Sequence, residues 1–519
     1  MASYLDFISS QTSTLHHHHL GLEEKTKTIT NNIHFILGNE AGDADSIVSA
    51  LTLGYVMTLE DHYYENDDDN FQSGSCNTNN RGVVVPIASV PRVDLPLRRD
   101  VVLLLELSGL NIAQLPCLDD ECIALCLEEP KERLALTLVD HNRIRSTLSH
   151  LSELVTEILD HHEDEGYHLE TTTATTTTSN KRVIAFEAGR ATVASTCTLV
   201  VERLFALLTA ISKKSNTALK TTTKIDGSLG LLLLGVILLD TINMSPTAGR
   251  GTLRDAQAIT ILLEQTDWSS FHRQQHHLEK SPASTMTGVN EEPSHALLQK
   301  RISPDRDNGD SSTNVGGAPN TTALFELLSN SRSDKKFWKE ASVSDCLRMD
   351  YKKFTVSSQS SSSSSSSSQS SSTSISSIGL STVLLSLDDF MSKHNFCTDL
   401  STYITLSDVD LLGVLTLDLY ENDDGTTTAI RGLLLASFHR EVVDSYAEFL
   451  LNGSEAAFLE LVDCSATTMA RKTNIDDIGC LKHIRVFQQG NARMGRKQIA
   501  PILLGGATSV AEKIVQRKY

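Results

Sequence analysis

Acidic residues follow four short apolar runs within the first 245 residues of this 519-residue chain. A short apolar run that ends in polar residues predicts a buried strand that opens into a loop. In an α/β fold with a mostly parallel sheet, the carboxyl ends of the strands share one edge, where ligands bind. We therefore expect an α/β fold with a polar site at that edge. The runs and their acids are Ile33–Leu37 with Asp43 and Asp45, Leu134–Val139 with Asp140, Leu154–Leu159 with Asp160, and Leu229–Leu239 with Asp240.

The third run continues into Asp160-His161-His162, which adds two imidazoles to the carboxylates. A single acid after an apolar run is most often a cap or turn residue, because aspartate favours those positions. Four such runs together with a histidine pair favour a chemical role instead. Carboxylates with a few imidazoles are the ligands of Mg²⁺ and Mn²⁺ sites. The sequence therefore predicts a divalent-metal site.

Four stretches in this order resemble the DHH phosphoesterase superfamily, and within it the eukaryotic exopolyphosphatase and prune branch. The resemblance covers most of residues 31–260 and, more patchily, residues 321–505. It implies a catalytic DHH domain with a mostly parallel sheet flanked by helices, followed by a smaller α+β domain of the DHHA2 type. The stretches that carry it are Gly38–Ser46, Pro91–Arg98, Asp160–Gly166 and Asn491–Pro501.

The resemblance also implies ligands for two divalent ions, Mg²⁺ or Mn²⁺, with Co²⁺ as a further option. By position in the family pattern, Asp43 ligates one ion and Asp45 the other. Asp140 bridges both ions in that pattern. His161 and Asp240 complete the ligands of the second ion.

Three further residues of this centre have different implied roles. His162 contacts the substrate or donates a proton to the leaving group, and Asp160 orients the histidines through a hydrogen bond. Asn39 stands where pyrophosphatases of the superfamily have histidine, so its amide is a candidate contact to metal or substrate. Because an amide oxygen is a harder and weaker ligand than imidazole, this exchange favours Mg²⁺ and argues against a dedicated pyrophosphatase.

Basic residues in the second half of the chain resemble the substrate-binding positions of the family. Arg496 and Lys497 match a basic pair near the C-terminus, and Arg493 adds a third charge. Lys352 resembles a further phosphate contact. Arginine suits bidentate contact with phosphate, whereas lysine acts as a compact point charge. Gly495 stands where the family usually has serine, so one hydroxyl contact is expected to be missing.

Composition limits the partners and the compartment. A net charge of −20 argues against a general nucleic-acid or membrane-surface binder. The nine cysteines contain no CxxC pair, which predicts reduced thiols in a cytoplasmic protein instead of a zinc site. The N-terminus has no basic region followed by an apolar core, so we expect no secretory signal. The longest apolar run, Leu229–Leu239, is too short to cross a bilayer and is predicted to be a strand buried on both faces.

Changes in composition along the chain predict its domains. Residues 1–30 are expected to be a disordered lead-in, 31–265 the metal-binding catalytic domain and 266–320 a linker. Residues 321–519 form the predicted substrate-binding domain, interrupted by a disordered serine-rich insert at 357–377. Within the first domain, Val101–Leu107 is predicted to be a strand. Arg98 is expected either to face the cleft or to lie in a solvated loop.

These expectations favour an exopolyphosphatase, a phosphoanhydride hydrolase that releases orthophosphate from the ends of inorganic polyphosphate through a metal-activated water. Its partner would be polyphosphate or another small phosphoanhydride, with a monomer favoured. Two alternatives stay open: a prune-like phosphodiesterase or short-chain polyphosphatase, and a non-catalytic interaction scaffold. The scaffold is disfavoured because no expected acidic or histidine ligand is missing.

Overall fold

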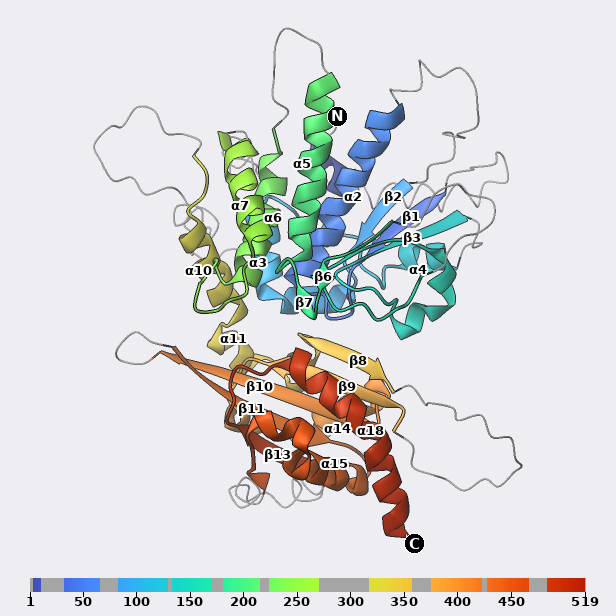
Figure 1. The fold of residues 1–519 in the computed structure, drawn as a ribbon, viewed down its shortest axis with the longest axis vertical. Coiled ribbons are helices and arrows are strands. Elements are labelled where there is room, and N and C mark those ends of the chain that lie inside the picture. The colour runs from blue at the N-terminus through green and yellow to red at the C-terminus, as the bar shows by residue number, and fades with distance from the viewer. Residues whose placement is uncertain are drawn as a thin grey trace, which may run out of the picture. The chain divides into compact units, whose positions relative to one another are not determined.

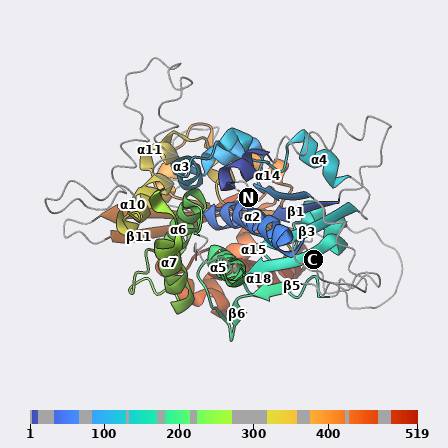
Figure 2. The same ribbon diagram turned by 90° about the horizontal axis from the view of Figure 1, so that it is seen from above.

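The computed structural model describes residues 3–10, 32–65, 83–128, 133–169, 181–214, 224–269, 317–356, 375–421, 427–465 and 483–518. The chain divides into two compact units, residues 1–332 and residues 333–519. Figures 1 and 2 show the helices and strands of each unit. No helix within the described ranges is both long and apolar enough to cross a membrane.

A five-stranded sheet forms the centre of the first unit. Its strand order is β2-β1-β3-β4-β5, and every neighbouring pair is parallel, as the sequence predicts for an α/β fold. Because all strands run the same way, their carboxyl ends lie along one edge of the sheet. The strands are β1 (Ile33–Leu37), β2 (Val83–Ile87), β3 (Leu134–Val139), β4 (Val155–Asp160) and β5 (Lys181–Ile184).

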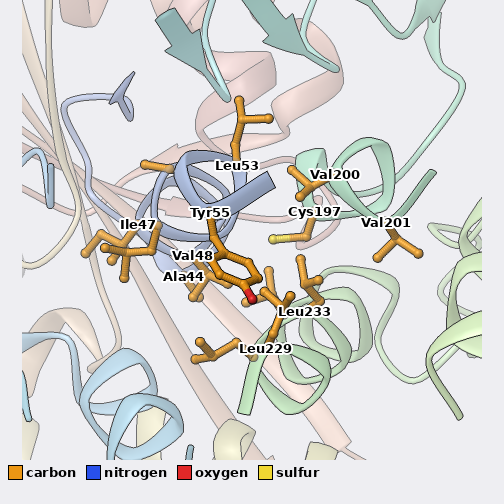
Figure 3. Close-up of a cluster of buried hydrophobic side chains, with 14 of the residues drawn as sticks. Ala44, Ile47, Val48, Leu53, Tyr55, Cys197, Val200, Val201, Leu229 and Leu233 are labelled. Atoms are coloured by element: carbon orange, nitrogen blue, oxygen red, sulfur yellow. The ribbon is translucent and has the colours of Figure 1, made fainter. Parts of the chain in front are cut away.

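Helices cover this sheet and bury its apolar side chains. Helices α2, α5, α6 and α7 pack against one another (Figures 1 and 2). Figure 3 shows side chains of three of them meeting in one apolar cluster, with Cys197 among them. The helices of this unit are α2 (Ala44–Glu65), α3 (Arg99–Leu107), α4 (Glu121–Leu127), α5 (Thr196–Lys214), α6 (Gly227–Thr241), α7 (Leu253–Gln265) and α10 (Thr321–Arg332). Short elements complete it: η3 (Arg92–Leu97), η4 (Ile112–Gln114), η6 (Ser146–Leu154), β6 (Phe186–Glu187) and β7 (Arg190–Ala191).

The prediction of a strand over Leu229–Leu239 is wrong, because this run forms most of helix α6. Asp226 caps the helix by accepting hydrogen bonds from the backbone N–H groups of Ser228 and Leu229. The helix is buried on nearly all sides, so its sequence is apolar all round and has no period that could distinguish helix from strand. Asp240 therefore lies in the last turn of a helix and not at the end of a strand.

Two further sequence predictions in this unit are wrong. Val101–Leu107 belongs to helix α3, which buries Val101, Leu104 and Leu105 at helical spacing. The expected lead-in is ordered at its start, because residues 4–10 are helical. Tyr4 and Ile8 are buried in the main core, and the ring of Tyr4 lies 5.3 Å from that of Tyr55. Residues 11–31 lie outside the described residues.

The position of helix α10 differs from the domain boundary that the sequence suggested at residue 321. It was assigned to the second domain, but Leu324 and Leu328 are buried in the core of the first unit, where α10 packs on α3 and α6. Arg332, the last residue of α10, pairs with Asp100 of α3 at 2.6 Å. The first unit therefore ends at Arg332. Most of the expected linker, residues 270–316, lies outside the described residues.

The second unit is an α+β domain around a six-stranded mixed sheet of order β12-β13-β11-β10-β9-β8. Only β9 and β10 are parallel among its neighbouring pairs. The apolar core joins the sheet to α15 and α18, and the Tyr446 hydroxyl donates to the Leu503 carbonyl between these helices at 3.0 Å. The strands are β8 (Tyr351–Thr355), β9 (Ser377–Val383), β10 (Leu411–Glu421), β11 (Thr427–Ala436), β12 (Leu461–Asp463) and β13 (Ile484–Gln489). The helices are α11 (Lys335–Glu340), α12 (Val343–Arg348), α13 (Leu387–Met391), α14 (Phe396–Ser407), α15 (Arg440–Asn452), η8 (Ser454–Leu459) and α18 (Arg496–Lys518).

The serine-rich insert is shorter than its composition suggested. Ile375 is buried and Ser377 begins β9, so the last three residues of the predicted insert at 357–377 belong to the fold. Asp410 fixes this strand start, because its carboxylate accepts hydrogen bonds from Ser376 and Ser377. Residues 357–374 lie outside the described residues.

Candidate metal centre

Adjacent strands of the first sheet bring the predicted metal-site residues to one edge. Asp140 follows β3 directly, Asp160 is the last residue of β4, and the loop after β1 begins at Gly38. Since β1, β3 and β4 are neighbours, their carboxyl ends meet. Asp140 adopts a left-handed φ of 62°, a conformation that aspartate tolerates better than most residues.

Asp140, His161 and His162 form a cluster whose potential ligand atoms all lie within 4.8 Å of one another and could hold a metal ion. Asp140 Oδ1 lies 3.3 Å from His161 Nε2 and 3.5 Å from His162 Nδ1. The two imidazole rings are 4.5 Å apart and nearly perpendicular. Asp140 and His161 are buried, whereas His162 is 28% exposed, so one histidine faces the interior and the other reaches solvent.

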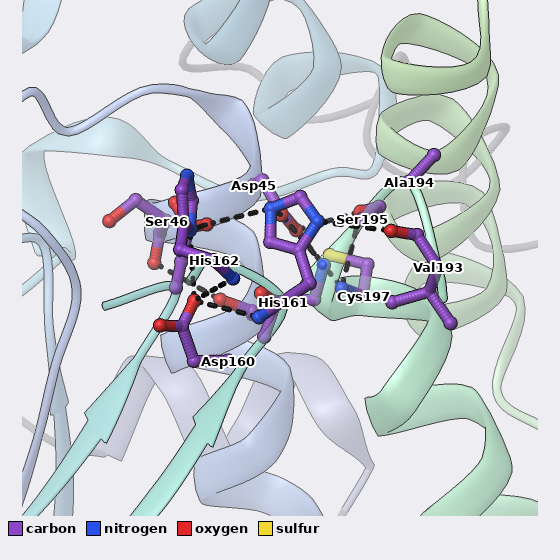
Figure 4. A network of polar contacts seen from close by, with 12 residues as sticks. Asp45, Ser46, Asp160, His161, His162, Val193, Ala194, Ser195 and Cys197 are labelled. Carbon is purple, nitrogen blue, oxygen red and sulfur yellow. Dashed lines mark hydrogen bonds and ion pairs between the residues drawn. The ribbon is translucent and has the colours of Figure 1, made fainter. Parts of the chain in front are cut away.

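Asp45 approaches the same cluster from the first turn of α2, with Oδ2 3.7 Å from His161 Nε2 (Figure 4). Its carboxylate accepts hydrogen bonds from the Ser195 hydroxyl at 2.8 Å and from the backbone N–H groups of Thr196 and Cys197 at 2.7 and 2.9 Å. These donors lie at the N-terminus of α5, where the helix dipole favours negative charge. Two helix starts therefore fix one buried carboxylate.

The tautomer of His161 follows from its second contact. Its Nδ1 lies 3.2 Å from the Val193 carbonyl, which can only accept a hydrogen bond. Nδ1 must therefore carry the proton in this contact. The lone pair of Nε2 is then directed toward Asp140 and Asp45, which is the arrangement of a metal-ligating imidazole.

Asp160 orients the two histidines through hydrogen bonds. Its Oδ1 accepts hydrogen bonds from the backbone N–H groups of His161 and His162 and lies 2.9 Å from His162 Nδ1. Its Oδ2 accepts a hydrogen bond from Asn142 Nδ2 at 2.7 Å. Burial alone would raise the pKa of Asp160, but these contacts with His162 and Asn142 outweigh it and lower the pKa. Asp160 is thus an ionised acceptor that orients His162 through its Nδ1 atom.

Asn39 contacts Asp140 with its amide nitrogen and not with its oxygen. Nδ2 donates to Asp140 Oδ2 at 2.6 Å, while Oδ1 accepts from the backbone N–H groups of Ala41 and Gly42. Gly42 has a left-handed φ of 55°, and a Cβ there would lie 2.1 Å from Val90 Cγ1, so glycine is required. In this arrangement Asn39 orients Asp140 instead of offering an oxygen to a cation.

The loop from Gly38 to Asp43 is held by Arg98, which faces neither a cleft nor solvent. Its buried guanidinium donates to the carbonyls of Ala41, Gly42 and Asp94 at 2.7, 2.8 and 2.8 Å. The other basic residue of this segment, Arg92, pairs with Asp120 at 2.6 Å. Arg98 therefore supports the loop, whereas Arg92 is held by the segment around Asp120.

Unbalanced negative charge characterises the centre. Burial, followed by the charges of Asp45 and Asp43, raises the pKa of Asp140 well above its usual range. The same causes, in the same order, raise the pKa of Asp240 to about 8. Asp240 Oδ2 is buried and has no hydrogen-bond partner within the described parts of the chain. Buried carboxylates that repel one another and leave an oxygen unpaired fit a site for cations.

Asp43 and Asp240 lie close enough to this cluster for their charges to interact with it: Asp43 acts on Asp140, and His161 acts on Asp240. Asp43 is exposed and accepts a hydrogen bond from the Ser46 backbone N–H at 3.0 Å, which caps the start of α2. Asp240 precedes three consecutive residues with left-handed φ, Ile242 to Met244. Left-handed backbone at a β-branched residue such as Ile242 is strained, and strain of this kind often marks functional segments.

The predicted phosphate-binding residues of the second unit gather around the start of α18. Arg496, its first residue, pairs with Asp350 Oδ1 at 2.6 Å and also donates to the Asp350 carbonyl. Arg493 and Lys497 are exposed on either side of it. Lys352 lies on β8, two residues after Asp350. Arg496 is thus positioned by a carboxylate, while Arg493 and Lys497 reach solvent.

Residues 332–505 match the family model of the DHHA2 domain. The chain is 23% identical to the exopolyphosphatase PRUNE1 of Rattus norvegicus over 472 residues, which cover 91% of this chain and 74% of the relative. The second unit is thus similar to DHHA2 domains, and most of the chain is similar to relatives of the prune branch of the DHH phosphoesterase superfamily.

Other comparisons cover different shares of the chain. The exopolyphosphatase PRUNE1 of Bos taurus is 29% identical over 230 residues, which are 44% of this chain and 41% of the relative. A solved structure from Methanococcus jannaschii, described as a family II inorganic pyrophosphatase, has a TM-score of 0.43 and 16% identity. It covers 92% of this chain and 99% of its own.

Sequence reasoning missed several residues that support this centre. Asn142 orients Asp160, and Ser195 holds Asp45. Arg98 was considered only as a surface or cleft charge. Ser195 stands just before α5, so a search for helix-start residues would have singled it out. Nothing in the local sequence predicts that this helix start faces Asp45, which is 150 residues away.

Proposed function

We propose that this chain is a metal-dependent exopolyphosphatase that hydrolyses terminal phosphoanhydride bonds of inorganic polyphosphate and releases orthophosphate. The observation that carries the proposal is the cluster of Asp140, His161 and His162, with Asp45 beside it. It occurs in a chain that aligns over 91% of its length with a relative named exopolyphosphatase. A buried anionic cluster of this kind suits a phosphoanhydride only if cations balance both charges.

The residues present fit two divalent ions, Mg²⁺ or Mn²⁺. Asp43, Asp45, Asp140, His161 and Asp240 would hold them, with Asp140 as the shared ligand. When bound, such ions lower the pKa of a water molecule and neutralise charge on the transferring phosphoryl group. The unpaired Oδ2 of Asp240 and the raised pKa values of Asp140 and Asp240 support this assignment.

The side chains around this site have separate roles in the proposed reaction. His161 keeps its proton on Nδ1 through the Val193 carbonyl, which leaves Nε2 unprotonated as a ligand atom. Asn39 holds Asp140 in place by donating to its Oδ2 atom. His162 is held at Nδ1 by Asp160 and is partly exposed, so its Nε2 atom can meet the substrate. In the imidazolium form of His162, Nε2 carries a second proton and gives it to the leaving phosphate oxygen, which leaves the neutral ring with its proton on Nδ1.

Phosphate groups of the substrate require positive charge in addition to that of the metal ions. We assign their recognition to Lys352, Arg493, Arg496 and Lys497 in the second unit. The Asp350 contact orients the Arg496 guanidinium and limits its side-chain freedom before substrate binds. This preorganisation favours a charge-assisted contact with phosphate.

A phosphate-release assay tests the proposal. Purified protein with Mg²⁺ or Mn²⁺ is given long polyphosphate, tripolyphosphate, pyrophosphate and cyclic AMP in parallel. Release of orthophosphate from long polyphosphate, without the fragments that cleavage of internal bonds would produce, supports terminal hydrolysis. Activity confined to tripolyphosphate or cyclic AMP would favour a short-chain polyphosphatase or a phosphodiesterase instead. Full metal binding without turnover of any substrate would support the scaffold.

A further inference from the structure

Asp255 is a fully buried carboxylate outside the cluster of acids and histidines. It lies in the first turn of α7 and forms a capping box with Thr252. Its Oδ2 accepts hydrogen bonds from the Thr252 backbone N–H and hydroxyl, both at 2.8 Å. These contacts with Thr252 complete the capping box. They do not involve Oδ1, the other oxygen of the carboxylate.

The other side of Asp255 holds a different segment, about 60 residues earlier in the chain. Oδ1 accepts a hydrogen bond from the Thr198 hydroxyl at 2.6 Å. The Ala194 backbone N–H lies 3.1 Å from Oδ1 and 3.0 Å from Oδ2 and donates to both. Asp255 therefore fixes the turn before α5 at Ala194 and the first turn of α5 at Thr198.

That segment is the one that touches the metal-site residues. Val193, the residue before Ala194, offers its carbonyl to His161 Nδ1. Ser195, the residue after it, donates its hydroxyl to Asp45 Oδ1, and Thr196 and Cys197 add their backbone N–H groups. Figure 4 shows Val193, Ala194, Ser195 and Cys197 along one side of His161 and Asp45. One turn therefore orients both an imidazole and a carboxylate.

We propose that Asp255 is a positioning residue of the metal centre, acting through the segment 193–198, which we call the orienting turn. By anchoring Ala194 and Thr198, it holds the Val193 carbonyl against His161 Nδ1 and the N-terminus of α5 against Asp45. Loss of this anchor lets the orienting turn shift, so that His161 loses its fixed tautomer and Asp45 loses its three donors together. The proposal rests on the proposed metal centre and adds a determinant of its geometry.

Asp255→Asn tests this, because asparagine has the same shape but replaces one acceptor oxygen with an NH₂ group. Thr252→Ala is the matched control: it removes the hydroxyl that donates to Asp255 Oδ2 and weakens the same helix cap, yet it leaves both contacts to the orienting turn. Both variants should lower the melting temperature. Only Asp255→Asn should weaken Mn²⁺ binding, measured by calorimetry well below the melting temperatures, by about tenfold or more.

A second readout needs no metal. In metal-free wild type and in Thr252→Ala, the ¹⁵N NMR signals of His161 should show a proton fixed on Nδ1, because Val193 accepts it. In Asp255→Asn these signals should move toward the average of the two tautomers. If Asp255→Asn does not fold, Thr198→Val replaces it, since this change removes one anchor of the orienting turn and keeps the helix cap.

The outcomes separate this proposal from the proposed function. If wild type and all variants fail to bind Mn²⁺, the metal centre itself is refuted. If wild type binds Mn²⁺ and Asp255→Asn binds it within twofold, with unchanged His161 signals, Asp255 is only a helix cap and the positioning role is refuted. A tenfold loss shared equally by Thr252→Ala would also refute it, because general destabilisation would then explain both variants.

Discussion

Asp240→Asn should stabilise the metal-free protein while weakening its metal binding. Burial and the charges of Asp45 and Asp43 raise the pKa of Asp240 from its usual 3.8 to about 8. The ionised carboxylate therefore destabilises the folded state, and Oδ2 has no hydrogen-bond partner among the described residues that would offset this. Asparagine keeps the shape and removes the charge. Removing a metal ligand usually destabilises the metal-bound protein. Stabilisation of the metal-free protein by Asp240→Asn would therefore indicate that the carboxylates of the site repel one another.

The magnitude and its pH dependence follow from the same shift. A difference of about four pKa units corresponds to about 5–6 kcal/mol as an upper limit, at about 1.36 kcal/mol for each unit. Water penetration and relaxation reduce such terms, so we expect about 1–3 kcal/mol at pH 8. The folded state binds this proton more tightly than the unfolded state. The stability that protonation contributes is therefore complete below pH 4 and is lost as the pH rises to about 8, so the advantage of Asp240→Asn should grow over that range.

Thermal unfolding of metal-free protein in a chelator, from pH 5 to pH 8.5, measures the effect. We expect Asp240→Asn to unfold about 2–8 °C above wild type at pH 8 and close to wild type at pH 5. Glu128→Gln, which removes an exposed acid of the same unit, is the control and should change little. Saturating Mn²⁺ should raise the melting temperature of wild type more than that of the variant. A variant that is less stable than wild type without metal at every pH would refute the charge-repulsion argument.

Three further predictions address other parts of the molecule. Asp140→Asn should lower polyphosphate turnover by several orders of magnitude with an unchanged circular dichroism spectrum, and activity within tenfold of wild type would contradict its role as shared ligand. Arg496→Ala should lower kcat/KM by about ten- to a hundredfold, which corresponds to about 1.5–3 kcal/mol, while Mn²⁺ affinity by calorimetry stays the same. Lost Mn²⁺ affinity would instead place metal ligands in the second unit. Tyr4→Phe should leave the free energy of unfolding unchanged or raise it by up to about 1 kcal/mol, because the buried Tyr4 hydroxyl has no hydrogen-bond partner within the described residues. Tyr4→Ala, by contrast, should cost about 3–5 kcal/mol in chemical denaturation, and a harmless Tyr4→Ala would show that the N-terminal helix does not support the core.

The local sequence pattern was sufficient to predict the strands that carry site residues at their carboxyl ends. The runs before Asp140 and Asp160 have the length and apolar character of strands, and both became parallel neighbours, β3 and β4. Parallel pairing places their carboxyl ends at one edge, so the meeting of Asp140 with His161 and His162 follows from the sequence alone. The order of motifs along the chain was likewise enough to indicate the family.

The local sequence pattern did not predict the type of element where a helix is buried on nearly all sides. The run before Asp240 forms α6, and the run at Val101–Leu107 belongs to α3. An element surrounded by other apolar elements has no polar face, so its sequence lacks the period that distinguishes a helix from a strand. The N-terminal helix was missed for a related reason, since its few apolar residues gain stability only by packing against Tyr55 and its neighbours.

The sequence by itself therefore determined which groups supply the chemistry and which edge of the sheet brings most of them together. Only the tertiary structure decided how these groups are oriented. Asp45 takes its hydrogen bonds from Ser195 to Cys197, His161 is set by the Val193 carbonyl, and the turn between them is anchored by Asp255. Such contacts join backbone groups far apart in the chain. A backbone N–H or carbonyl is present at nearly every residue, so no residue pattern can show which of them will face a given side chain until the helices and strands have packed.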